Sequence, residues 1–162
     1  YLYNKLKLFS YSLKEQINNK KKLYLSDNGF ISLGYSFSSN YGKLLENLVF
    51  TELQKADFEI FYFNSDFECD FIAKKADKAI AIQVCYSLNE ENKKREINAF
   101  LKLPFNVDEK YIITYNQRDK IDDIEVISFW EYFQGFNNNW NEDIKELSGS
   151  WSDLIEFEEI KN

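Results

Sequence analysis

Polar side chains interrupt two neighbouring apolar stretches between residues 67 and 87. Glu68 and Asp70 interrupt the first stretch, and Gln83 interrupts the second. The charged turn between the stretches is typical of a β-hairpin, and successive side chains of a strand point to opposite faces. Strict alternation would therefore place Cys69 and Phe71 on one face and the two acids on the other. Polar groups at alternate positions of paired strands indicate either a solvated face or a functional site.

A further carboxylate comes from residues 41–56, which have the spacing of an amphipathic helix without an internal breaker. Glu46 shares an apolar stripe with Val49, Phe50 and Leu53, so we expect its side chain to point toward the sheet or its edge. A buried carboxylate without a partner would cost on the order of several kcal/mol. Glu46 therefore needs a cation, hydrogen bonds or water, and a rim glutamate paired with a neighbouring lysine satisfies the same spacing.

Two registers of the hairpin are compatible with its sequence. One places Asp70 opposite Gln83, so that their oxygen atoms lie near one another and Glu46 can join them from the helix. Three converging oxygen donors suit a hard cation such as Mg²⁺, which keeps several waters. A shift of one residue would instead pair Cys69 with Cys85 and separate the oxygens. Periodicity does not choose between these registers.

The composition excludes several classes of chemistry. The 162 residues include no histidine, so Ser-His-Asp and Cys-His catalysis and the commonest zinc ligand are absent. Two cysteines in predicted strands do not form a disulfide framework, and with no visible signal peptide they indicate a reducing cytoplasm. No apolar run of about 18 residues is present, so we expect no membrane span. The P-loop lysine motif is missing, so we expect no ATP site in this chain.

The net charge of −7 is unevenly distributed along the chain. Residues 1–22 contain six lysines and one glutamate, and residues 135–162 contain seven acids and two lysines. An acidic protein repels nucleic acid, so only the basic beginning of the chain favours contact with DNA. Solvated terminal segments are the simpler interpretation of both ends. The acidic segment also carries Trp140, Trp151 and Phe157, which favours a tail docked on the domain or a contact with a protein partner.

The order of the predicted elements defines a fold class. Strands are expected at 21–27, 58–64, 109–116 and 124–128 and in the hairpin, and helices at 41–56, 90–103 and 130–136. This order predicts an α/β domain with a mixed central sheet flanked by helices, in which the strand after the second helix runs parallel to the hairpin strand before it. We divide the chain into a linker or edge segment from a preceding module (1–22), the domain (23–134) and an acidic tail (135–162).

The motifs GKLLENLVFTEL, FECDFIA, AIQVCYS and KREINAFLKL, in this order, resemble the PD-(D/E)XK nuclease fold. They resemble more closely the C-terminal domain of a group of bacterial and archaeal AAA+ family ATPases. YLYNKLKLFSYSLKEQ and KKLYLSDNGF are similar to the segment that joins the ATPase to this domain, and IEVISFWEYF is similar to its closing strand and helix. The resemblance covers residues 1 to about 134. It implies a restriction-endonuclease-like core, an N-terminal AAA+ ATPase module and Mg²⁺-dependent cleavage of DNA.

Carried over residue by residue, Glu46 matches the helix glutamate of the family and Asp70 matches its metal-binding aspartate. Gln83 and Cys85 occupy the (D/E)-x-K positions. In active members two acids hold Mg²⁺ and the lysine orients or activates the attacking water. Gln83 still offers an oxygen, whereas a neutral thiol at Cys85 cannot replace the lysine. The resemblance therefore assigns Glu46, Asp70 and Gln83 to the metal. It leaves Lys93 or Lys94, at the basic start of the next helix, as the substitute lysine.

Two functions stay open at this point. The first is a Mg²⁺-dependent DNA endonuclease-type domain that works with an AAA+ ATPase module. The second is a catalytically inactive module of the same fold that binds DNA or a protein partner. Metal-linked stabilisation distinguishes them, because only a protein that binds Mg²⁺ is stabilised by it.

Overall fold

The computed structural model describes residues 2–29 and 40–139 of the chain. Its strands are β1 (Tyr3–Leu8), β2 (Lys22–Leu25), β3 (Glu59–Asn64), β4 (Glu68–Lys75), β5 (Lys78–Val84), β6 (Glu109–Thr114), β7 (Asp119–Ile121) and β8 (Ile124–Ser128). Its helices are α1 (Leu13–Asn18), α3 (Tyr41–Lys55), α4 (Lys93–Leu101) and α5 (Phe129–Asn139). Most of the predicted acidic tail lies outside the described residues.

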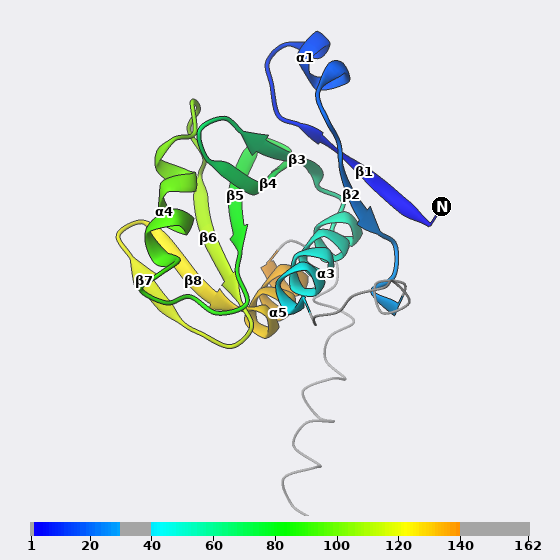
Figure 1. The fold of residues 1–162 in the computed structure, drawn as a ribbon. Coiled ribbons are helices and arrows are strands. Elements are labelled where there is room, and N and C mark those ends of the chain that lie inside the picture. Colours follow the sequence, from blue (N-terminus) through cyan, green and yellow to red (C-terminus); the bar gives the residue numbers. More distant parts are fainter. Residues whose placement is uncertain (1, 30–39, 140–162) are drawn as a thin grey trace, which may run out of the picture.

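The strands of this described part form one mixed sheet in the order β2-β1-β3-β4-β5-β6-β8-β7. β3, β4 and β5 are antiparallel neighbours, whereas β5, β6 and β8 run parallel. The hairpin of β1 and β2 extends the sheet at one edge, because β1 pairs in parallel with β3. Helices α3 and α5 pack on one face of the sheet and α4 packs on the other (Figure 1).

The two faces of the sheet carry separate apolar cores. Along β5, Ile80 and Ile82 join the core under α3, whereas Ala81 joins the core under α4. On α3, Val49 and Leu53 lie one turn apart and are fully buried. Burying a side chain of this size contributes about 1.5–3 kcal/mol. The apolar stripe of α3 therefore fixes this helix on the sheet, and it thereby also fixes the position of Glu46, which belongs to the same helix.

The structure confirms the predicted mixed α/β domain and the parallel return after α4. The short strand β7 was not predicted. The sheet also continues across the predicted boundary after residue 22, because β1 belongs to it. None of the helices within residues 2–29 and 40–139 is long and apolar enough to cross a membrane.

The register of the β4–β5 hairpin is the one that brings the predicted polar residues together. Phe71 pairs with Ile82, so the next position places Asp70 opposite Gln83. A direct contact agrees with this register, since the backbone N–H of Asp70 donates to Oε1 of Gln83 at 2.9 Å. The two cysteines are consequently unpaired with each other and remain free thiols.

The predicted alternation along β4 is interrupted at Asp70. Cys69 packs in the core on the α4 side, whereas Phe71 packs in the core on the α3 side. The prediction that these two residues share a face is therefore wrong. The register between β3 and β4 shifts at the same point, which is the signature of a β-bulge. The bulge matters for the site, because it re-aims the carboxylate of Asp70.

Candidate functional site

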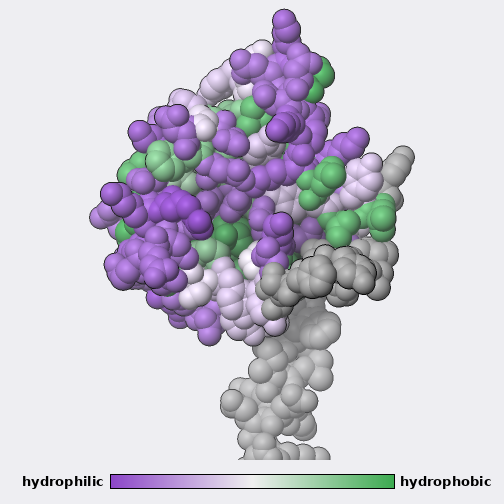
Figure 2. Space-filling model, viewed as in Figure 1, coloured by the Kyte–Doolittle hydropathy of each residue, from purple (hydrophilic) through white to green (hydrophobic). Residues whose placement is uncertain are grey.

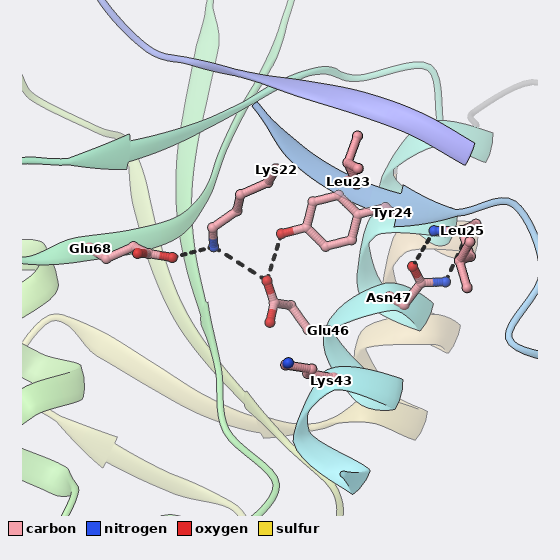
Figure 3. A pocket seen from close by; sticks show the side chains of 8 residues that line it. All are labelled: Lys22, Leu23, Tyr24, Leu25, Lys43, Glu46, Asn47 and Glu68. Atoms are coloured by element: carbon pink, nitrogen blue, oxygen red, sulfur yellow. Dashed lines mark hydrogen bonds and ion pairs between the residues drawn. The ribbon is translucent and has the colours of Figure 1, made fainter. Parts of the chain in front are cut away.

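One lysine and three carboxylates form a compact ionic group, which we call the Lys22 cluster (Lys22, Glu46, Glu68 and Asp70). The ammonium Nζ of Lys22 lies 3.3 Å from Oε1 of Glu46 and 3.2 Å from Oδ1 of Asp70. It also forms a close ion pair with Glu68, whose side chain is the most exposed of the group. Figure 3 shows Lys22 reaching in from β2 between Glu68 and Glu46. The cluster therefore joins the edge hairpin, α3 and β4 at one point.

The alternation of β2 determines that Lys22 points inward. Lys22 and Tyr24 lie on the side of β2 that faces α3, whereas Leu23 between them is exposed. Asn47 of α3 holds the strand in place, since its side chain accepts from the backbone N–H of Leu25 at 2.8 Å and donates to the backbone oxygen of Leu25 at 2.9 Å (Figure 3). This buried amide satisfies two strand groups that would otherwise be costly to bury.

Tyr24 fixes the position of the Glu46 carboxylate. Its ring stacks on Phe50 with centroids 4.4 Å apart, and its hydroxyl donates to Oε1 of Glu46 at 2.6 Å. Burial and the neighbouring Glu46 charge raise the pKa of Tyr24 well above its ordinary value, so the hydroxyl stays protonated and acts as a donor. Oε1 of Glu46 thus accepts from both Tyr24 and Lys22.

The carboxylate of Asp70 is shared between the cluster and the backbone of β5. Its Oδ1 accepts from Lys22, and its Oδ2 accepts from the backbone N–H of Val84 at 3.0 Å. Burial, followed by the negative charge of Glu46, raises the pKa of Asp70 from 3.8 to about 7, although Lys22 and the Val84 N–H act in the opposite direction. Asp70 therefore titrates near neutral pH.

The same carboxylates act on Lys22. Burial by itself would lower the pKa of this ammonium, but the charges of Asp70, Glu46 and Glu68 raise the pKa above its ordinary value. Lys22 is therefore a permanent cation at physiological pH. Three carboxylates around one ammonium leave the cluster with an excess of negative charge when all are ionised.

Gln83 belongs to a different set of contacts, which we call the Gln83 network. Its Oε1 accepts from the backbone of Asp70, and its Nε2 donates to Oε2 of Glu96 at 2.9 Å. Glu96 is almost completely buried on α4, and its other oxygen accepts from Nε of Arg95 at 3.1 Å. Gln83 therefore links β4 to α4, and its side-chain groups are used within the protein.

The structure brings all three predicted metal ligands, Glu46, Asp70 and Gln83, to the lining of one pocket. Glu46 and Asp70 converge on Lys22, whereas Gln83 contacts Glu96 on the α4 side. Within the described ranges, Lys94 is exposed on α4 and makes no hydrogen bond or ion pair with the predicted site residues.

Cys85 occupies the lysine position of the resembled motif. It packs beside Ala99 and Phe100 in the core under α4. Burial and the nearby charge of Glu96 raise the pKa of the Cys85 thiol to about 12. The thiol is consequently neutral at physiological pH and supplies no charge to the Lys22 cluster.

The described residues do not fit a Mg²⁺ site in this arrangement. Among them, no group of three or more His, Cys, Asp or Glu residues is arranged to hold a metal ion. The ammonium of Lys22 lies between the carboxylates, where a cation would have to bind, and the amide of Gln83 is already bonded to the backbone of Asp70 and to Glu96. A divalent cation would therefore compete with Lys22 for the same oxygens.

Sequence reasoning missed Lys22, Tyr24 and Glu96 as members of these groups. The signal for the first two was present, because Lys22 and Tyr24 are two residues apart in a short predicted strand and must share a face. Nothing in the sequence indicated that this face meets α3. Glu96 is adjacent to Arg95 in the sequence, and its burial depends on how α4 packs on the sheet.

Fold and site together define a mixed α/β domain with a lysine-centred carboxylate cluster where the edge hairpin meets α3. The family model described as "Domain of unknown function (DUF4143)" matches residues 41–132, more than half of the chain, and the chain belongs to this family. The matched range includes Glu46, Asp70 and Gln83, whereas Lys22 precedes it.

The comparison with curated proteins identifies relatives that are longer than this chain. A Methanocaldococcus jannaschii protein named "Uncharacterized protein MJ1544" is 39% identical, over 81% of this chain and 35% of its own length. A Haemophilus influenzae protein named "Uncharacterized protein" is 33% identical, over 78% of this chain and 32% of its own length. The chain therefore spans about a third of the length of these relatives. No solved structure matches the chain.

Proposed function

We propose that this chain is a nuclease-like domain of the PD-(D/E)XK type that does not cut DNA and serves as a binding or regulatory module. The observation that carries the proposal is the position of Lys22. Its ammonium forms ion pairs with both Glu46 and Asp70, the two acids that an active member would use for Mg²⁺. The lysine acts as an internal cation that holds the site together without a metal.

The other two motif positions support the same proposal. Gln83 has no charge with which to bind Mg²⁺, and its amide is engaged with Asp70 and Glu96. Cys85 is a buried neutral thiol. An active site of this type needs a charged group beside the attacking water, and the thiol cannot supply one. The polar residues of the motif are therefore accounted for by structural contacts.

The second candidate is a Mg²⁺-dependent phosphodiesterase that acts on DNA. The convergence of Glu46 and Asp70 on a single cation favours it, because this is the pair that the resemblance assigns to the metal. In this case Lys22, and not Lys94, would be the lysine of the site. The candidate requires that Mg²⁺ displace the ammonium from both carboxylates.

The longer protein is the natural setting for either function. The chain spans about a third of the length of its relatives, and the resemblance of its motifs supports the proposal that an AAA+ ATPase module precedes it. A silent nuclease-like module would then serve that ATPase as a docking platform for DNA or for a protein partner.

The test compares the 162-residue protein with the variant Asp70→Ala in DNA cleavage. Both are incubated with plasmid and single-stranded DNA in millimolar Mg²⁺ or Mn²⁺. We expect the same background for both, and we expect the melting temperature of the wild-type protein to be independent of Mg²⁺. Cleavage that requires Asp70, or a melting temperature that rises with Mg²⁺ in the wild type alone, would establish the second candidate instead.

A further inference from the structure

The outward face of the edge hairpin is exposed, apolar and basic at the same time. The alternation that turns Lys22 and Tyr24 inward turns Leu23 outward, and Lys5 pairs with Leu23 across the hairpin. We call the exposed residues Tyr3, Lys5, Lys7 and Leu23 the hairpin outer face. Leu23 is 63% exposed and Tyr3 is 46% exposed, so two large apolar side chains of this strand pair face solvent.

The helix at the tip of the hairpin continues this character. α1 buries none of its residues, and its Leu13 and Ile17, four residues apart on one side of the helix, are 72% and 67% exposed. Figure 2 shows apolar patches over the hairpin and α1 within a predominantly hydrophilic surface. A six-residue helix without a packed face has little stability of its own. Both elements therefore have the properties of a surface that is covered in the working protein.

The charge of this surface limits what can cover it. Residues 1–22 carry six lysines and one glutamate, and Lys5, Lys7, Lys14 and Lys20 are exposed. A covering segment must therefore offer apolar side chains together with negative charge. Such a combination gives both burial and electrostatic complementarity.

We propose that residues 140–162 of the same polypeptide dock on the hairpin outer face and α1. This segment contains seven acids and two lysines, and its acids alternate closely with Trp140, Trp151, Phe157 and further apolar residues. Its charge of −5 is opposite in sign to the +4 of residues 1–21, a count that leaves out the inward-pointing Lys22. The 23 residues can span up to about 75 Å when extended, several times the roughly 20 Å length of a six-residue strand such as β1.

Photo-cross-linking in the complete 162-residue chain tests this proposal. Trp151 is replaced by the photoreactive residue p-benzoyl-phenylalanine, and the cross-linked peptides are identified by mass spectrometry. We expect the products to join position 151 to residues 2–25. A mixture of isotopically labelled and unlabelled chains shows whether the contact is within one chain or between two copies.

Two charge-reversed proteins provide the matched comparison. Lys5→Glu with Lys7→Glu should reduce the yield of these cross-links about fivefold or more, because two attractive charges become repulsive. Lys94→Glu with Lys102→Glu changes two exposed lysines of α4 and the residue after it by the same amount and should leave the yield unchanged. Leu23→Ser should also reduce the yield, without altering charge.

The outcomes separate this proposal from its alternatives and from the proposed function. Cross-links that map to another surface, or that respond equally to both charge reversals, would assign the hairpin outer face to a different occupant such as DNA or another protein. The absence of cross-links to residues 2–25 would overturn the proposal as well. DNA cleavage enters neither readout, so the result is independent of whether the domain is catalytically silent.

Discussion

The Lys22 cluster and the Gln83 network both contact the β4–β5 hairpin, but they differ in how their charges are balanced. The Lys22 cluster gathers three carboxylates around one ammonium, and its members come from three separate parts of the chain. The Gln83 network instead places a neutral amide between the backbone of Asp70 and the buried carboxylate of Glu96, which Arg95 neutralises. The first group concentrates unbalanced charge, and the second balances it.

This difference shows how the residue types suit their surroundings. A neutral amide at position 83 is compatible with a neighbouring buried carboxylate, whereas an acid there would face Glu96 at hydrogen-bond distance. Lys22 supplies the positive charge that the remaining acids need. Each group can be perturbed by a single substitution, and the comparison predicts how differently they respond.

The largest effect is expected from Lys22→Met. This change removes the cation and leaves three carboxylates facing one another, so the free energy of unfolding at pH 8 should fall by about 3–5 kcal/mol. Millimolar Mg²⁺ should recover part of this loss in the variant but should not stabilise the wild type, because the metal can then bind in place of the ammonium. Urea denaturation with and without Mg²⁺ measures both effects.

Lys43→Met is the matched control for that experiment. Lys43 lines the same pocket in Figure 3, but it forms no ion pair with the carboxylates of the described residues. Its replacement should change the free energy of unfolding by no more than about 0.5 kcal/mol. A Lys22→Met protein as stable as this control would remove the basis for calling Lys22 an internal cation.

The second effect concerns the pH dependence of the cluster. The pKa of Asp70 is raised to about 7 in the folded protein from 3.8, so between these values the folded state binds its proton more tightly than the unfolded state does. The contribution of Asp70 to the free energy of unfolding is then present at low pH and is lost as the pH rises from about 4 to about 7. Asp70→Asn should remove this decline, which we expect to be about 3–4 kcal/mol over the interval.

The quantity that tests the role of Asp70 is the slope of the free energy of unfolding against pH, and not the free energy of unfolding at any one pH. The side-chain amide in the Asp70→Asn variant would still offer an oxygen to the Val84 N–H, so the fold is retained while the titration is lost. Denaturation curves of wild type and Asp70→Asn at several pH values should therefore diverge steadily between pH 4 and 7. Parallel pH profiles would show that Asp70 titrates at its ordinary pKa.

Much of the fold was predictable because the local patterns agree with the tertiary structure. The stripe of Val49 and Leu53 identified α3, and the runs on either side of the charged turn identified the β4–β5 hairpin. The bulge at Asp70 was not predictable, since it depends on how β3 pairs with β4. The strand β7 was missed because three residues of mixed polarity give no periodic signal.

The site was only half predictable, for a related reason. Glu46 and Asp70 were found from their types and from the order of motifs around them, and the structure places both against one ammonium. The identity of that ammonium depends on a contact between residues 22 and 46, which is created by the pairing of the edge hairpin and by the Asn47 clamp on β2. The sequence offers Lys93 and Lys94 as equally plausible lysines, and only tertiary packing excludes them from the cluster.

The smallest loss of stability is expected from a substitution in the Gln83 network. Gln83→Glu restores an acid at the motif position but replaces the amide donor that Glu96 accepts, so two carboxylates would face each other. We expect a loss of about 2 kcal/mol in the free energy of unfolding at pH 8. The loss should shrink at low pH, where one carboxyl holds a proton.

The double variant Gln83→Glu with Glu96→Gln should recover most of the lost free energy of unfolding, because a donor and an acceptor are then restored in reverse order. If Gln83→Glu were instead neutral and the double variant less stable, the network would not be balancing the charge of Glu96, and the contrast between the two groups would fail.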